Sequence, residues 1–201
     1  MNLYLFIFYC SFLLVLFVIP SYLTFKKTGI KAFQFNKEDN TINYAGKVYR
    51  IISLMTFLVI SFNAFLPKTI IYFVPIDYIV SESVRWIGLF IIHLSFVWIF
   101  IAQRNMATEW RIGIDKVNKV RLITKGLFSI SRNPIFFGVI LVFSGLFFML
   151  PNVVTAVILV SGYIVIQVQV RLEEEFLLKE LGDEYILYKN KVKRWIYYKQ
   201  K

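Results

Sequence analysis

The sequence has few of the residues from which many metal and redox sites are built. It contains one cysteine and one histidine among 201 residues. Because Cys10 has no second cysteine, neither a disulfide nor a cysteine-based metal site can form within one chain. His93 lies in an apolar run without Asp, Glu or a second His. We therefore predict no metal site, and expect His93 to hydrogen-bond a neighbouring helix rather than to relay protons.

Acidic residues are also scarce, and long stretches carry no charge at all. The chain has 12 Asp and Glu against 23 Lys and Arg, which gives a formal net charge of +11. No Asp, Glu, Lys, Arg or His occurs between Ile135 and Val170. With 58% hydrophobic and 18% aromatic residues, the composition excludes an ordinary soluble domain. It indicates an integral membrane protein.

Five apolar runs have about the length that a tilted helix needs to cross a bilayer. They are Leu3 to Leu23, Val48 to Leu66, Val84 to Ala102, Pro134 to Leu150 and Val153 to Val170. The first run lacks the basic start and the small-residue cleavage pattern of a signal peptide, so we expect a retained helix. The sequence therefore predicts an all-α integral membrane protein with about five transmembrane helices, forming a single membrane domain over residues 1–201.

The basic residues predict the orientation of these helices. Six lie near the loop after the first span, seven near the loop after the third, and eight after the last span. The loop after the second span has only Lys68 and Arg85. Because basic loops stay in the cytoplasm, we expect the N-terminus outside and the C-terminus inside. The juxtamembrane position of the charges favours contact with the lipid bilayer over nucleic-acid binding.

Apolar residues recur at spacings of three and four after the last span, between Glu173 and Lys193. This pattern predicts a C-terminal amphipathic cytoplasmic helix. Gly182 lies within it, so we expect an interruption or a bend there. Such a helix is expected to fold back on the membrane or on the loop before the fourth span.

Charged groups stand at both feet of the hairpin formed by the last two apolar runs. Arg132, Asn133 and Pro134 precede it, and Glu173 and Glu174 follow it. Taken singly, an arginine here reads as an interfacial anchor, Asn-Pro as a helix start, and the glutamates as a solvated helix turn. Because a hairpin returns the chain to the same face of the membrane, the combination favours a functional site there.

Five segments at the C-terminal end have a recognisable order and spacing. They are Thr124 to Phe128, Arg132 to Gly138, Glu173-Glu174, Leu181 to Tyr185 with Tyr188, and Val192 to Trp195. Together they resemble the isoprenylcysteine carboxyl methyltransferase and phospholipid methyltransferase superfamily. The resemblance covers about Glu109 to Ile196, and the first three spans match only in being apolar. It makes residues 104–201 the motif-bearing catalytic region.

The resemblance implies methyl transfer from S-adenosyl-L-methionine, at the cytoplasmic face, to a lipophilic acceptor that is prenyl-like, a lipid or a small molecule. It implies catalytic roles for Arg132, Glu173 and Glu174. The cofactor-binding residues that it implies are Leu122, Ile123, Gly126, Phe128, Arg132, Asn133, Pro134, Phe136 and Glu173.

These residue types suit the cofactor. Arg132 can pair with its carboxylate by two hydrogen bonds, and Glu173 or Glu174 can accept from its ammonium or a ribose hydroxyl. The aromatic faces of Phe128 and Phe136 can contact adenine or the sulfonium. A carboxylate acceptor needs no base, whereas an amine must lose a proton, for which Glu174 is the nearest candidate.

Three positions depart from the pattern of the superfamily. Asn133 stands where most members have histidine, and Asn cannot titrate, so a base role there is excluded. Phe136 replaces a frequent tyrosine, and Gln169 stands where some members carry a substrate-contacting arginine. We expect Tyr185, Tyr188 and Trp195 to be packing residues or interfacial anchors and do not assign them to the site.

Two other classes of function stay open at this point. A multispan sterol or steroid reductase shares a similar C-terminal arrangement and binds a nicotinamide cofactor. A non-catalytic transporter or assembly factor is less favoured because the spans offer no polar pathway. The compact form leads us to expect a bacterial inner-membrane protein, and the sequence predicts no oligomeric state.

Overall fold

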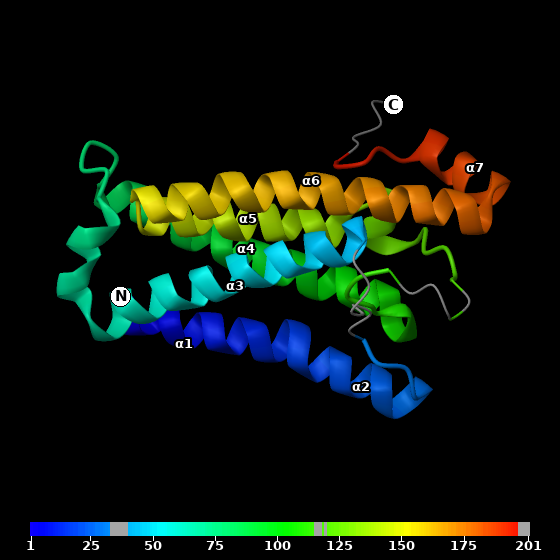
Figure 1. The fold of residues 1–201 in the computed structure, drawn as a ribbon, viewed down its shortest axis with the longest axis horizontal. Coiled ribbons are helices and arrows are strands. Elements are labelled where there is room, and N and C mark those ends of the chain that lie inside the picture. Colours follow the sequence, from blue (N-terminus) through cyan, green and yellow to red (C-terminus); the bar gives the residue numbers. More distant parts are fainter. Residues whose placement is uncertain (33–39, 115–117, 119, 197–201) are drawn as a thin grey trace.

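A computed structural model describes residues 1–32, 40–114, 118 and 120–196, which form a bundle of long helices (Figure 1). In chain order the elements are α1 (Asn2–Leu13), the π-helical turn η1 (Leu14–Val18), α2 (Ile19–Thr28), α3 (Thr41–Phe65), the 3₁₀ helix η2 (Pro67–Phe73), α4 (Glu82–Met106), the 3₁₀ turns η3 (Ala107–Glu109) and η4 (Gly126–Ser129), α5 (Pro134–Met149), α6 (Val153–Leu181) and α7 (Asp183–Lys191).

Four helical stretches of the described residues are long and apolar enough to cross a membrane. They are Asn2–Thr28, in which α1, η1 and α2 are continuous, and the single helices α3, α4 and α6. The fourth expected span is the shorter apolar helix α5, whose 16 residues extend about 24 Å. The all-α membrane fold predicted from the sequence is thus confirmed.

The C-terminal helix begins and ends differently from the prediction. Glu173 does not start a separate amphipathic helix, because α6 continues without a break to Leu181. The residues after Val170 are mostly Glu, Leu and Lys, which favour helix, and no Gly or Pro occurs among them before Gly182. At 29 residues α6 extends about 43 Å, so its last turns project beyond a bilayer core of about 30 Å. The predicted interruption at Gly182 is present, with φ at +52°.

Side-chain caps fix where several helices begin. The Asn40 carboxamide accepts from the Asn43 backbone N–H at the start of α3, and the Ser81 hydroxyl accepts from the Val84 N–H at the start of α4. Asn152 and Thr155 form a reciprocal capping box at the start of α6. Each cap satisfies backbone donors that the first turn of a helix leaves free.

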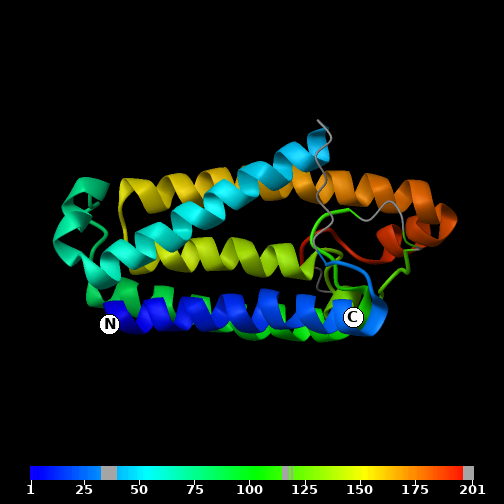
Figure 2. The ribbon, with the colours of Figure 1, turned by 60° about the horizontal axis from the view of Figure 1, so that its bottom comes forward.

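Glycines let α4 and α5 approach each other closely. A Cβ atom added at Gly88 of α4 would lie 2.7 Å from the Gly145 carbonyl oxygen of α5, and one added at Gly145 would lie 2.7 Å from Ile92 Cγ1. On the other side of α5, a Cβ at Gly162 of α6 would lie 2.6 Å from the Phe143 ring. Small residues at such interfaces allow helix backbones to pack tightly in membranes. As a result α5 is held between α4 and α6 (Figure 2).

The main core lies along the inner faces of the spanning helices. Its buried residues are Phe12, Leu16, Ile52, Val59, Ile99, Val139, Val142, Phe143, Ile158, Ile166 and Val170. Many large apolar side chains of α1, α3, α4 and α6 are instead exposed on the outside of the bundle. Exposed apolar belts of this kind are expected on surfaces that face lipid.

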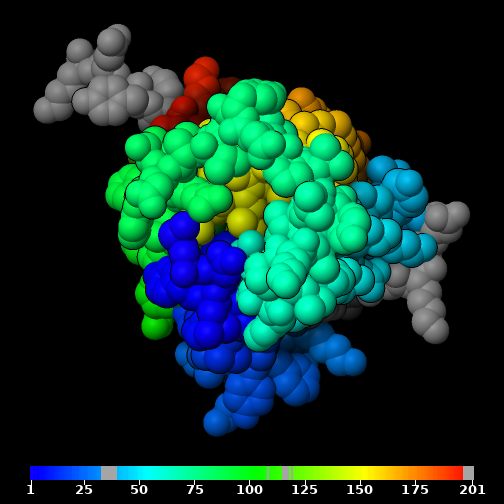
Figure 3. Space-filling model, turned by 90° about the vertical axis from the view of Figure 1, so that its left-hand side faces the viewer, coloured from blue at the N-terminus to red at the C-terminus, as the bar shows by residue number. Residues whose placement is uncertain are grey.

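The two ends of the bundle differ in character. At one end, η2 and the residues after it cover the turn between α5 and α6, where the Ile76 N–H donates to the Pro151 carbonyl at 3.0 Å. Figure 3 looks onto this end, with the segment after α3 spread beside the N-terminus. The opposite end gathers the loop between α4 and α5, the end of α6, and α7 (Figure 1). Both sequence motifs therefore lie at one end of the bundle.

His93 hydrogen-bonds a neighbouring helix, as expected. Its Nε2 lies 2.6 Å from the Tyr4 hydroxyl of α1, and its Nδ1 lies 2.8 Å from the Leu89 carbonyl oxygen of its own helix. The carbonyl oxygen can only accept, so Nδ1 carries the proton and Nε2 accepts from Tyr4. The pair joins α1 to α4.

Candidate functional site

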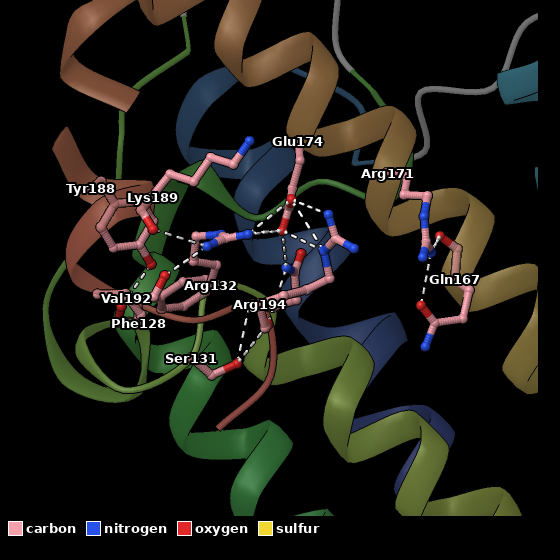
Figure 4. Close-up of polar contacts among 11 residues, drawn as sticks. Phe128, Ser131, Arg132, Gln167, Arg171, Glu174, Tyr188, Lys189, Val192 and Arg194 are labelled. Carbon is pink, nitrogen blue, oxygen red and sulfur yellow. Dashed lines mark hydrogen bonds and ion pairs between the residues drawn. The ribbon is translucent and has the colours of Figure 1, made fainter. Parts of the chain in front are cut away.

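Arg132 and Glu174 form the centre of the polar end of the bundle (Figure 4). Arg132 Nη2 donates to both carboxylate oxygens of Glu174 at 3.0 Å, and Nε donates to Oε1 at 3.2 Å. Each side chain is 7% exposed. This two-pronged contact ties the residue before α5 to the far end of α6. The two feet of the hairpin are thus in direct contact.

The other donors of Arg132 go to the last turn of α7 and to the residue that follows this helix. Nη1 donates to the Val192 carbonyl oxygen at 2.7 Å and to the Lys189 carbonyl oxygen at 3.2 Å. With Nε and Nη2 on Glu174, all five N–H groups of the guanidinium have acceptors within the protein. The Arg132 backbone N–H also donates, to the Lys193 carbonyl oxygen at 3.0 Å. In this arrangement Arg132 holds protein segments together.

Glu174 is held by two further side chains. Arg194 donates to it through Nη2, 2.9 Å from Oε2, and through Nε, 3.2 Å from both oxygens. The Asn133 amide nitrogen donates to Oε1 at 2.9 Å. The hydrogen bond to Glu174 raises the pKa of Arg194, which is more exposed, at 32%, than Arg132. We call Arg132, Asn133, Glu174 and Arg194 the clamp.

Asn133 occupies the N-cap position of α5, but its side chain makes no cap hydrogen bond. The amide nitrogen donates instead to Glu174 and, at 3.3 Å, to the Arg194 carbonyl oxygen. The Ser131 hydroxyl donates to the same carbonyl and accepts from the Asn133 backbone N–H. Pro134 follows at the first position of α5, where its missing N–H costs nothing. Residues 131–134 thus both begin α5 and contribute to the clamp.

Helix α7 folds back onto the loop before α5, as the sequence predicted. Tyr185, Tyr188 and Val192 form a small buried cluster, and the Tyr188 hydroxyl donates to the Phe128 carbonyl oxygen at 2.6 Å. Tyr185 is 1% exposed, and its hydroxyl has no hydrogen-bond partner among the described residues. Burial raises the pKa of Tyr185 to about 12, and the charge of Glu174 acts in the same direction while Arg132 opposes it.

A cavity of about 120 Å³, which we call the loop cavity, lies between the α4–α5 loop, the end of α6, and α7. Its wall contains charged and polar side chains, among them Arg121, Glu173 and Tyr185. Arg121 is exposed and makes no hydrogen bond or ion pair with a described residue. The unpaired Tyr185 hydroxyl is therefore part of a polar wall that has unused hydrogen-bonding groups.

A second cavity of about 100 Å³, which we call the helix cavity, lies deeper in the bundle among α3, α5 and α6. Most of its wall is apolar, including Phe17, Ile135, Phe136 and Val165. The two cavities share a wall formed by Met106, Arg111, Gly113, Phe128, Arg132, Asn133 and Glu173. A space with charged groups in its wall and a more apolar space thus meet where the hairpin begins and ends.

The predicted site residues divide between these spaces. Leu122 and Ile123 line the loop cavity, while Pro134 and Phe136 line the helix cavity. Glu174 lines neither. Gly126 lies in neither wall, because it packs against Asn105, whose Oδ1 accepts from the Leu127 N–H at 3.0 Å. With φ at +61° and Asn105 in the space of a Cβ, the position requires glycine.

Glu173 and Glu174 differ although they are neighbours on α6. Successive helical residues point about 100° apart, so only one of them faces the clamp. Glu173 borders both cavities and makes no hydrogen bond or ion pair with a described residue. The Glu173 side chain is half-buried and borders the two cavities. Of the two glutamates, only Glu173 lines the cavities.

Of the two alternatives predicted for Tyr185 and Tyr188, packing is confirmed, because both are buried and pack against each other. Both also line the loop cavity, which the sequence did not predict. Arg194 carried no assigned role, yet it pairs with Glu174. Arg194 belongs to the last motif segment, and this was the one feature of the sequence that pointed to a role for it. Its contact with Glu174 could not be predicted, because it forms only when the chain turns back at Gly182.

Residues 83–184 match the family model described as Phospholipid methyltransferase, which is half of the chain. The chain belongs to the phospholipid methyltransferase family. This confirms the resemblance drawn from the motif segments, since the family is part of the isoprenylcysteine and phospholipid methyltransferase superfamily. No curated protein matches the chain.

The matched range corrects the extent of the resemblance. It begins at the start of α4, so the third span takes part in the match and does not resemble the family only in being apolar. It ends at Glu184, before the last motif segment. Membership supports a multi-pass membrane methyltransferase over the reductase and the non-catalytic alternatives.

Proposed function

We propose that this protein transfers a methyl group from S-adenosyl-L-methionine to a lipophilic acceptor at the membrane. The observation that carries the proposal is the meeting, along one shared wall, of a cavity that has several charged side chains with a more apolar cavity. A charged cofactor and an apolar acceptor need such different surroundings, and the reacting atoms need to come together where the two spaces join.

The residues of the loop cavity fit the cofactor. Glu173 has an unpaired carboxylate that suits the ammonium group or a ribose hydroxyl, and the Tyr185 hydroxyl is an orphaned buried group that gains a partner when a ligand binds. The face of Phe128 suits the adenine or the sulfonium. When bound, the cofactor supplies a methyl group on a cationic sulfur.

Arg121 is the better candidate to hold the carboxylate of the cofactor than Arg132. All five donors of Arg132 already have acceptors within the protein, and freeing them would break the clamp. Arg121 lines the same cavity and has no partner among the described residues. We therefore assign Arg132 and Glu174 to positioning: they fix the feet of the hairpin and so the shared wall.

Residues 104–201 carry all of these groups except those that α3 and η1 contribute to the helix cavity. We also propose that the end of the bundle with the clamp faces the cytoplasm. Described basic residues of three separate segments gather there: Lys26 and Lys27 at the end of α2, Arg104 in the last turn of α4, and Lys189 and Lys191 in the last turn of α7.

Transfer of radiolabel from [methyl-³H] S-adenosyl-L-methionine into organic-extractable material tests the proposal, using membranes that contain the protein. The wild type is expected to label lipophilic material, and Glu173→Gln is expected to lose most of this labelling. Glu175→Gln is the matched control, because Glu175 is exposed and lines neither cavity. Labelling no higher than in membranes without the protein would contradict the proposal, as would equal labelling by the two variants.

A further inference from the structure

The apolar wall of the helix cavity contains an uncharged polar side chain that has no partner in the protein. Gln169 of α6 is 8% exposed, lines the cavity, and makes no hydrogen bond with a described residue. Its amide offers two donors and an acceptor. Leaving these groups unpaired away from water costs free energy, which a hydrogen-bonding ligand in the cavity would recover.

A second uncharged group lines the same cavity from another helix. Tyr49 of α3 borders it, and its backbone carbonyl accepts from the Ser53 hydroxyl, but its phenolic hydroxyl has no partner among the described residues. Tyr49 lies outside the range that matches the family model. The two groups thus come from different helices, α3 and α6, and the family comparison does not account for Tyr49.

The charged side chains in the wall of the helix cavity all lie at its boundary with the loop cavity. Arg111, Arg132 and Glu173 line both cavities, and the residues that line the helix cavity alone are uncharged. Under the proposed function Glu173 meets the positive charge of the cofactor at this boundary. A phosphate or a carboxylate placed beside Gln169 and Tyr49 would be desolvated with no counter-ion among the residues that line the helix cavity alone.

We propose that the helix cavity binds an uncharged amphiphile, an apolar chain or ring that bears a hydroxyl or carbonyl group, and that Gln169 and Tyr49 hydrogen-bond this oxygen. This inference rests on the proposed function, for which it names the class of acceptor molecule. The amide and the phenol can each donate to the oxygen, and the amide carbonyl can accept from a hydroxyl proton. Neither group offers a full charge, so both select neutral ligands.

Photolabelling tests this selection without any turnover. The probe is a twelve-carbon alcohol with a diazirine in its chain, added to the protein in nanodiscs and located by mass spectrometry. Its competitors are 1-dodecanol, dodecanoate and dodecylamine, which share the chain and differ in charge. Label is expected on peptides that line the helix cavity, and 1-dodecanol is expected to compete about tenfold better than either ion.

Two pairs of variants locate the recognition. Gln169→Leu and Tyr49→Phe are expected to weaken labelling about tenfold and a few-fold respectively. Gln167→Leu is the matched control on α6, where Gln167 contacts Arg171 away from the cavity. Tyr44→Phe is the control on α3, because Tyr44 is 65% exposed. Equal labelling of Gln169→Leu and Gln167→Leu would overturn the proposal, as would competition by either ion that matches that of the alcohol.

Binding of S-adenosyl-L-methionine to the same samples separates this inference from the proposed function. Gln169→Leu and Tyr49→Phe should leave cofactor affinity unchanged, since neither residue lines the loop cavity. Alcohol-selective labelling without any cofactor binding would support the inference and refute the proposed function. Binding of S-adenosyl-L-methionine without any preference for the alcohol would support the proposed function and refute the inference.

Discussion

Arg132 Nη2 lies 3.0 Å from both carboxylate oxygens of Glu174, across 42 residues of chain that include Ile135 to Val170, where no Asp, Glu, Lys, Arg or His occurs. Both side chains are almost fully buried. The pair therefore joins the start of the hairpin to its end, beside the wall that the loop and helix cavities share.

Removing the charge of Glu174 should destabilise the protein. Glu174→Gln leaves two guanidinium groups without their carboxylate, and breaking a buried ion pair from one side costs about 3 kcal/mol. The apparent melting temperature of the purified protein measures this loss. Glu175→Gln, at an exposed neighbouring position, should melt with the wild type. If both variants melt like the wild type, Glu174 does not anchor the clamp.

The two tyrosines of α7 should respond differently to loss of their hydroxyls. Tyr188→Phe removes a hydrogen bond to the Phe128 carbonyl and should cost about 1 kcal/mol. Tyr185→Phe removes a buried hydroxyl that has no partner among the described residues, so stability should stay equal or rise slightly. Thermal unfolding of the two variants side by side makes the comparison.

The same Tyr185→Phe variant should bind S-adenosyl-L-methionine more weakly, since the hydroxyl lines the loop cavity. The expected loss is about fivefold, the value of one neutral hydrogen bond. Calorimetric titration measures it. Unchanged cofactor affinity together with a large fall in stability would make Tyr185 a packing residue only.

Close packing of α4 against α5 should make Gly88 intolerant of a methyl group. The added Cβ in Gly88→Ala would lie 2.7 Å from backbone atoms of α5, so the helices must shift, at a cost of roughly 2 kcal/mol. Ser144→Ala is the control on α5, because the Ser144 hydroxyl bonds only the Ile140 carbonyl of its own helix. Melting of Gly88→Ala at the temperature of the control would argue against this interface.

The proposed orientation can be tested by labelling with a membrane-impermeant maleimide in intact cells. In a Cys10→Ser background, Tyr78→Cys presents a thiol at a position that is 90% exposed, at the end of the bundle far from the clamp. Lys179→Cys presents one at the clamp end. We expect the first to react from outside and the second only after permeabilisation. The reverse pattern would invert the topology.

The spanning helices, and the position of the two motifs at one end of the bundle, could be predicted from the sequence. Apolar runs of spanning length have few alternatives in a bilayer, and a hairpin without charges must return its ends to the same face. The uncharged hairpin therefore predicts that Arg132 and Glu174 lie at the same end of the bundle. The sequence also led us to expect His93 to bond another helix, which it does through Tyr4.

The partners of individual side chains were beyond the sequence because they depend on how separate segments fold together. Arg132 was expected to face a ligand, but because the chain turns at Gly182, its Nη1 donates to the carbonyl oxygens of Lys189, in the last turn of α7, and of Val192, just after it. Asn133 suited an N-cap, yet its side chain makes no cap hydrogen bond, and its amide nitrogen donates to the buried carboxylate of Glu174. Whether Arg132 also contacts a ligand stays a prediction.

Calorimetric titration of the purified protein with S-adenosyl-L-methionine, and separately with reduced nicotinamide dinucleotides, distinguishes a methyltransferase from a reductase. We expect saturable binding of S-adenosyl-L-methionine alone, about tenfold weaker in Glu173→Gln and unchanged in Glu175→Gln. Folded protein that binds the nicotinamide instead, or binds neither compound, would contradict this expectation.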